Sequence, residues 1–212
     1  MNAMGRATAR APLEKPAALK VPLFRALMER MEAGGRHVIL DLGPASTEVL
    51  SLLGRFRCRV EIADAAADGG LEQLNAEEED ETAEDLAARA EALLPPPPAA
   101  DVAFDLVLCW DLANYLRPAA LSALMTAIAA RARPDALAHA LIVYSERTMP
   151  GRPSRFVPTE DLLLLNRGTP AAEIPAPRYS PDDLGRMMGG FAIDRAVLLA
   201  NGMQEFLLRL RG

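Results

Sequence analysis

The chain has 212 residues, half of them hydrophobic, and a formal net charge of -6. This length and composition predict a globular domain with room for a sizeable core, and the acidity argues against general binding to a nucleic-acid backbone. No stretch is apolar for long enough to span a bilayer, and residues 1–16 lack the apolar segment of a secretory signal. We therefore expect a cytoplasmic protein with neither a nucleic-acid nor a membrane partner, whereas nothing in the sequence indicates its oligomeric state.

The cysteines and histidines do not form a pattern typical of a metal site. Cys58 and Cys109 lie far apart, each in or beside a predicted buried strand, so we expect two reduced packing residues. His37 and His139 form no ligand pair with them. The prediction is therefore that no metal is bound, and that both histidines are structural residues at or within strands.

The N-terminal part predicts helices alternating with short strands. Residues 1–20 are predicted to form a flexible tail, and residues 21–212 a single domain. The expected elements in this part are a helix over 21–32, a strand over 36–42, a helix over 47–53 and a strand over 57–63. In the second helix we expect Val49, Leu50 and Leu53 to face inward.

Residues 71–100 are predicted to form an acidic and proline-rich insert. Charged residues and alanine dominate residues 71–94, which predicts a mobile loop and one helix over 84–93, without the strand that a doubly wound sheet usually has there. The four prolines over 95–98 predict an extended connection to the next strand.

The C-terminal part continues the alternation and ends in a hairpin. The expected elements are a strand over 104–109, a helix over 118–131, a turn over 133–135, a strand over 136–144, a helix over 181–188 with Ser180 as N-cap, and strands over 191–199 and 204–210. Asn201 and Gly202 between the last two strands are typical of a hairpin turn. Residues 145–180 are predicted to be a long covering loop with one short apolar piece, 161–165.

This order of elements predicts an α/β fold. Strands that alternate with helices indicate a doubly wound, mostly parallel sheet with helices on both faces. The C-terminal hairpin adds an antiparallel pair at the edge of that sheet, because a two-residue turn cannot join parallel strands.

Polar residues follow three of the predicted strands. The first strand ends at Asp41 and Gly43, the second at Asp64, and the third leads into Trp110 and Asp111. Open α/β sheets bind ligands at the carboxyl ends of their strands, so these residues are predicted to form the functional site.

With these strand ends and the closing hairpin, the chain from about residue 23 to residue 210 resembles a class I S-adenosylmethionine-dependent methyltransferase. The resemblance implies that S-adenosylmethionine is the cofactor and that the turn after the first strand contacts its methionine part. It implies that the acid after the second strand binds the ribose, about 20 residues beyond that turn. The end of the fourth strand of the family would line the methyl side. The cofactor-binding residues so implied are Asp41, Gly43, Pro44, Ala45, Asp64, Ala65, Cys109, Trp110 and Asp111.

The turn after the first strand departs from the family pattern, so two hypotheses about function stay open. The family turn reads acid-x-Gly-x-Gly-x-Gly, whereas here only Gly43 is present, and no third-strand acid can be placed beyond the weak candidate Glu91.

The first hypothesis is methyl transfer to a small-molecule acceptor recognised by residues 145–180, with Asp111 as a candidate catalytic base. The second is a catalytically inactive protein of the same fold that acts as a binding or regulatory partner. A nicotinamide-dependent oxidoreductase is disfavoured, because the Gly-x-Gly-x-x-Gly motif is missing.

Overall fold

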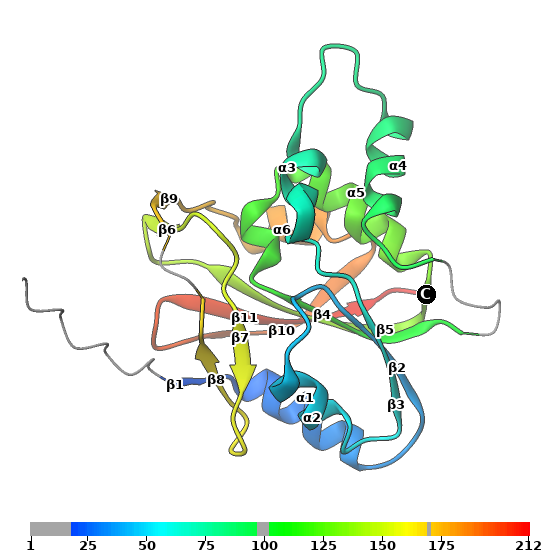
Figure 1. Ribbon diagram of the computed structural model, residues 1–212, viewed down its shortest axis with the longest axis vertical. Coiled ribbons are helices and arrows are strands. Elements are labelled where there is room, and N and C mark those ends of the chain that lie inside the picture. Colours follow the sequence, from blue (N-terminus) through cyan, green and yellow to red (C-terminus); the bar gives the residue numbers. More distant parts are fainter. Residues whose placement is uncertain (1–17, 97–101, 169–170) are drawn as a thin grey trace, which may run out of the picture.

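A six-stranded mixed sheet is the centre of the molecule (Figure 1). The computed structural model describes residues 18–96, 102–168 and 171–212, so the expected tail up to residue 17 and the prolines at 97 and 98 lie outside the described residues. The strand order is β10-β11-β5-β4-β2-β3. The six strands are β2 (His37–Asp41), β3 (Cys58–Ile62), β4 (Phe104–Trp110), β5 (Ala132–Val143), β10 (Phe191–Leu198) and β11 (Met203–Leu210).

The strand directions confirm the predicted fold class. β3, β2, β4 and β5 run parallel to one another, whereas β11 pairs antiparallel with both β5 and β10. The hairpin therefore closes one edge of the sheet and β3 forms the other. Within the described part of residues 71–100 there is no strand, as the sequence predicted.

Helices cover both faces of the sheet (Figure 1). On one face lie α1 (Pro22–Glu32) and α2 (Thr47–Leu53). On the other lie α3 (Gly70–Asn75), α4 (Ala83–Ala92), α5 (Pro118–Ala129) and α6 (Pro181–Met187), with the short 3-10 helices η1 (Ala67–Gly69) and η2 (Leu112–Tyr115) near the strand ends. None of the helices in the described ranges is both long and apolar enough to cross a membrane.

The inward face of α2 differs from the prediction by one position. Val49 and Leu53 are buried as expected, but Leu52 takes the third inward position and Leu50 is 43% exposed. In a helix of seven residues that begins at Thr47, only one stripe faces the sheet, and Leu50 lies on the opposite side.

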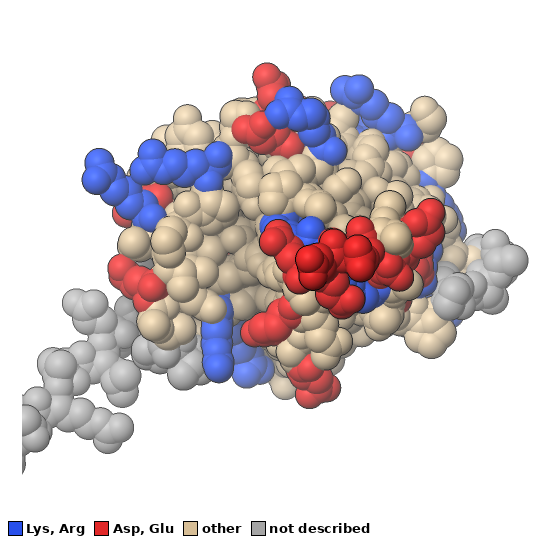
Figure 2. All heavy atoms as spheres, turned by 90° about the horizontal axis from the view of Figure 1, so that it is seen from above, with Lys and Arg blue, Asp and Glu red and all other residues tan. Residues whose placement is uncertain are grey.

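The acidic insert has more structure than the sequence indicated. Besides the expected helix, α3 forms over Gly70–Asn75, so the expectation of a loop up to residue 83 is wrong. A turn rich in acidic residues joins α3 to α4, and Figure 2 shows its side chains gathered at this end of the molecule. Glu81 fastens the turn, because its carboxylate pairs with Arg89 of α4 and with Arg117 before α5, at 2.6 Å from Arg117.

The turn expected over 133–135 is instead part of β5, which begins at Ala132. Asp135 has a φ of +64°, and the register between β4 and β5 shifts between Phe104 and Leu106. Pro134 therefore lies at an irregularity inside the strand. Proline has no backbone N–H to donate, and a bulge leaves such a position outside the regular hydrogen-bonding pattern.

Residues 145–180 form an arm with strands of its own and not a plain loop. The arm contains β6 (Thr148–Pro150), β7 (Phe156–Pro158), β8 (Leu163–Asn166) and β9 (Glu173–Pro175). β6 pairs with β9, and β8 pairs with β7 on one side and with β1 (Ala18–Lys20) on the other. The last three residues of the predicted tail are therefore a strand, because β8 offers them an edge that lies far away in the sequence.

The first turn of α1 is capped by a residue from the other end of the chain. Val21 provides no side-chain cap, and the buried carboxylate of Glu205 on β11 accepts the N–H groups of Leu23 and Phe24 at 3.0 and 2.7 Å. The same carboxylate contacts Nε2 of His139 on β5 at 2.9 Å. Glu205 thus joins α1 to two neighbouring strands.

Candidate functional site

The carboxyl ends of β2, β3 and β4 lie side by side. They form the carboxyl-end edge of the sheet, which differs from its two lateral edges at β10 and β3. Backbone hydrogen bonds continue past the strands, from the Ala63 N–H to the Asp41 carbonyl at 2.8 Å and from the Leu42 N–H to the Leu108 carbonyl at 3.0 Å. The parallel pairing therefore brings together three of the predicted site residues, Asp41, Asp64 and Trp110, which come from three segments of the chain.

Hydrogen bonds and a close steric contact join Asp41, Gly43 and Trp110 at this edge. One carboxylate oxygen of Asp41, Oδ1, accepts the indole Nε1–H of Trp110 at 2.6 Å and the Gly43 N–H at 3.0 Å. A Cβ atom on Gly43 would lie 2.7 Å from Cδ1 of the indole and 2.8 Å from Nε1. The indole thus lies directly on the glycine, which is needed here because any side chain would collide with it.

Burial changes the titration of Asp41. The carboxyl is only 2% exposed, and this burial raises its pKa to about 6, although the hydrogen bonds from Trp110 and Gly43 oppose the shift. The charge of Asp64, at the end of the neighbouring strand β3, adds to this increase in the pKa of Asp41.

The backbone of Trp110 is strained. Its φ of +49° is unusual for a bulky side chain and costs about 1–3 kcal/mol. The pairing of β4 with β5 also shifts between Leu108 and Trp110. The indole stacks on Phe156 of β7 with ring centroids 6.3 Å apart and contacts Phe24 of α1 at 5.7 Å. These contacts and the bond to Asp41 hold the strained conformation.

Asp64 is the available acid at this edge. It is half-buried at the end of β3, and its carboxylate accepts no hydrogen bond from any group in the described part of the chain. A carboxylate in this state can accept hydrogen bonds from two neighbouring hydroxyl groups, as the predicted ribose contact requires.

The remaining predicted cofactor residues lie around this group in different states. Pro44 is half-buried and Ala45 exposed, and Ser46 after them caps α2 by accepting the Val49 N–H at 3.1 Å. Ala65 and Cys109 are buried in the core on the helix-rich face. Burial and the charge of Asp41 raise the pKa of the Cys109 thiol to about 12, so this cysteine is a neutral packing residue.

Asp111 follows β4 directly, and its carboxylate accepts a hydrogen bond from the arm. Both of its carboxylate oxygens contact the Ser154 N–H, at 3.0 and 3.2 Å, and the side chain is buried. Burial raises the pKa of Asp111 to about 6, against the lowering effect of Ser154. Asp111 in turn helps raise the pKa of Tyr115, after the larger effect of burial.

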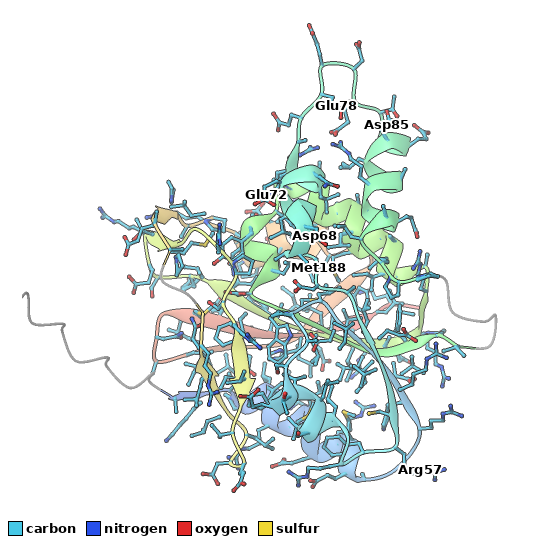
Figure 3. The ribbon with its side chains drawn as sticks, viewed as in Figure 1. Arg57, Asp68, Glu72, Glu78, Asp85 and Met188 are labelled. Atoms are coloured by element: carbon cyan, nitrogen blue, oxygen red, sulfur yellow. The ribbon has the colours of Figure 1, made fainter. Side chains whose placement is uncertain are left out.

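Two cavities lie between the sheet edge and the arm. The first, of about 720 Å³, is bounded by Asp111, by the end of β5 and by the arm, with Phe156 and Met203 among its apolar residues. The second, of about 780 Å³, is lined by Ala66, two residues after Asp64, and by residues of α3 and η2, whereas Asp64 itself lines neither cavity. Figure 3 places Asp68 and Glu72, which borders this second cavity, between the sheet and the acidic turn that carries Glu78.

Tyr115 and Arg152 stand between the two cavities and border both. The Tyr115 hydroxyl donates a hydrogen bond to the Arg152 carbonyl at 2.7 Å, which joins η2 to the arm. Within residues 145–180, which the sequence assigned to acceptor recognition, Arg152 borders both cavities, whereas Arg147 and Arg155 border neither. Phe156, within the segment that the sequence assigned to acceptor recognition, and Ser154, which sequence reasoning missed, join the arm to Trp110 and Asp111 at the strand ends.

The site fits one half of S-adenosylmethionine. Within the described residues the carboxylate of Asp64 is free to accept hydrogen bonds from a ribose, and Ala66, two residues further along, borders the second cavity. At the turn, the surface of Gly43 that would face the methionine part is covered by the indole of Trp110, and Asp41 is already hydrogen-bonded. Over the described residues, no three side chains of His, Cys, Asp or Glu come close enough together to hold a metal ion.

Solved structures that are similar to this chain include methyltransferases. An S-adenosylmethionine-dependent methyltransferase from Clostridium acetobutylicum ATCC 824 is 13% identical, over 89% of this chain and 91% of that one, with a TM-score of 0.51. The 1,6-didemethyltoxoflavin-N1-methyltransferase of Burkholderia thailandensis is 16% identical, over 90% and 79% of the two chains, with a TM-score of 0.47. Magnesium protoporphyrin IX methyltransferase from Synechocystis PCC 6803 is 12% identical, over 90% and 78%, with a TM-score of 0.47.

No protein-family model matches the chain, and no curated protein matches it by sequence. The similarity to the Clostridium acetobutylicum protein extends over nearly all of both chains and establishes the fold alone. The chain therefore has the class I S-adenosylmethionine-dependent methyltransferase fold, as the strand ends and the hairpin predicted.

Proposed function

We propose that this chain transfers a methyl group from S-adenosylmethionine to a small-molecule acceptor. The observation that carries the proposal is the carboxylate of Asp64, which accepts no hydrogen bond within the described residues and lies at the carboxyl end of β3, the strand next to that of Asp41, in a fold of this class. The cavity of about 720 Å³ behind Asp111 supports a small acceptor, because its volume is typical of small-molecule sites.

In this proposal the chain binds and aligns the reactants. The cofactor would supply a methyl group on a sulfonium, a reaction in which correct alignment provides much of the rate. Asp64 would hold the ribose hydroxyls, and the arm would exclude water from the acceptor cavity. Asp111 borders that cavity with a pKa of about 6, so near neutral pH it is ionised and can take a proton from an acceptor hydroxyl or ammonium group.

The test is a calorimetric titration with S-adenosylhomocysteine. We expect Asp64→Ala to weaken binding at least tenfold, which is about 1.4 kcal/mol, because the variant cannot accept hydrogen bonds from the ribose. Glu29→Ala is the matched control, since it removes an exposed carboxylate from α1 and is expected to leave the affinity unchanged. Equal affinity in wild type and Asp64→Ala would contradict the proposed site.

A second candidate is a catalytically inactive protein of this fold that acts as a binding or regulatory partner. The indole of Trp110 on Gly43 favours it, because that contact covers the turn on which the methionine part would bind. If neither the folded wild type nor a folded Trp110→Ala variant binds S-adenosylhomocysteine, this second function is the better one.

A further inference from the structure

Trp110 occupies the turn in the way that a ligand would. Its indole is 5% exposed, lies within 2.7 Å of where a Cβ of Gly43 would be, and donates its only N–H to Asp41. Asp41 and Gly43 are the two residues that the methionine part of the cofactor would contact. One carboxylate oxygen of Asp41 and the open face of Gly43 are therefore occupied by a side chain of the protein itself.

The neighbouring half of the site is in the opposite state. Asp64 is half-buried, and its carboxylate has no partner among the described residues. Asp64 itself does not line the cavity of about 780 Å³, but Ala66, two residues further along, does, together with the polar residues Glu72 and Asn75 of α3. A ribose held by Asp64 would leave its base room in this cavity.

We propose that Trp110 is an internal occupant of the methionine end of the site. The folded chain then recognises a nucleoside or 5′-thionucleoside without an amino-acid tail, and it binds the complete cofactor only when the indole leaves Gly43. This inference rests on the proposed function, since it assumes that Asp64 binds a ribose.

The position of Trp110 is coupled to the arm. The indole stacks on Phe156 of β7, and Phe156 also borders the acceptor cavity. One residue further along, Asp111 binds the Ser154 N–H of the same arm. Moving the indole away from Gly43 would break its stack on Phe156, so opening of the methionine end and movement of the arm belong to one rearrangement.

The chain contains one tryptophan, so its intrinsic fluorescence reports on Trp110 alone. We would titrate the full-length protein with 5′-methylthioadenosine and with S-adenosylhomocysteine, by calorimetry and by tryptophan emission. We expect 5′-methylthioadenosine to bind the wild type at least as tightly as S-adenosylhomocysteine does, without a change in emission wavelength. Any binding of S-adenosylhomocysteine is expected to shift the emission to the red, because the indole moves into water.

Two variants complete the test. Trp110→Ala empties the turn and is expected to strengthen S-adenosylhomocysteine binding at least tenfold, with the affinity for 5′-methylthioadenosine unchanged. Trp110→Phe keeps an aromatic ring against Phe156 but removes the N–H donor, so it serves if the alanine variant fails to fold, and a smaller gain of the same kind is expected.

The outcomes separate this inference from the proposed function. Tight binding of S-adenosylhomocysteine by the wild type, with tryptophan emission unchanged, would overturn the role of Trp110 and leave the proposed function standing. Absence of binding of both ligands, in the wild type and in both variants, would overturn both. Binding of 5′-methylthioadenosine that persists in Asp64→Ala would overturn the nucleoside site.

Discussion

Asp41 and Asp111 are two buried carboxyl groups that reach the same pKa by different contacts. Asp41 is held by the Trp110 indole and by its own turn, whereas Asp111 is held by a backbone N–H of the arm. In both, burial is the largest cause and raises the pKa from 3.8 to about 6. At neutral pH the folded protein therefore contains two ionised groups that would be more stable in water.

Removal of the buried charge at Asp111 should change how stability depends on pH. Because its pKa is higher in the folded state, the folded protein binds more protons than the unfolded chain between pH 3.8 and about 6, and stability falls as pH rises through this window. From pH 4 to pH 8, we expect the unfolding free energy of Asp111→Asn relative to wild type to rise by roughly 2 kcal/mol. Urea denaturation at both pH values measures this difference.

Asp85→Asn provides a control of opposite sign. Hydrogen bonds from the Thr82 hydroxyl and backbone lower the pKa of this exposed carboxyl, so its contribution to stability is present at neutral pH and lost in acid. This variant should therefore lose stability relative to wild type mainly at the higher pH. If the unfolding free energies of Asp111→Asn and of the wild type change in parallel with pH, burial does not raise the pKa of Asp111 in the folded protein.

Among the elements, α1 depends most on a distant residue. It begins at Pro22 without a local cap, and the two N–H groups of its first turn that need an acceptor point to Glu205 on β11. His139 shares the same carboxylate. A strand near the other end of the chain therefore holds the helix in position.

Glu205→Ala should destabilise the protein by about 3–5 kcal/mol, because it leaves two buried N–H groups and His139 without their acceptor. Glu205→Gln keeps an acceptor oxygen in place and is expected to cost clearly less. Urea denaturation of both variants, with far-UV circular dichroism to follow helix content, measures the effect. A loss below 1 kcal/mol in the alanine variant would mean that α1 does not rely on this contact.

The elements that the sequence predicted well have their signals within a few residues. Pro181–Met187 begins after Ser180, whose hydroxyl forms a capping box with Asp183, and the strands of the hairpin meet around Gly202 with its φ of +80°. The elements that were missed, such as β1 and the irregular start of β5, exist because a distant strand offers hydrogen bonds. No local pattern specifies that partner.

At the scale of the whole molecule, one sheet separates two cores. The core around α1 and α2 contains Trp110 and Leu207, and the core around α3 to α6 contains Cys109 and Leu208. Successive residues of β4 and of β11 point to opposite faces, so the same strands contribute to both. The two cores cannot be separated without breaking the sheet.

We therefore expect a single cooperative unfolding transition. Tryptophan fluorescence reports on the core that contains Trp110, and far-UV circular dichroism reports on the helices, most of which lie on the other face. The two signals should give the same urea midpoint, as one domain requires. Midpoints that differ by more than the fitting error would mean that the two faces unfold separately and that the single-domain prediction is wrong.

From the sequence we could predict the alternating strands and helices of the central sheet, the closing hairpin and the acids at the strand ends, but not β1, α3 or the strands of the arm. These features depend on periodicity and on turn residues, which act between near neighbours in the chain. The state of each acid, by contrast, depends on the fold: Asp41 binds the indole of Trp110, Asp111 binds Ser154, and Asp64 has no partner among the described residues. Hydrogen bonding and burial arise from segments 40 to 70 residues apart, and the spacing of residues along a chain does not specify which of them will meet.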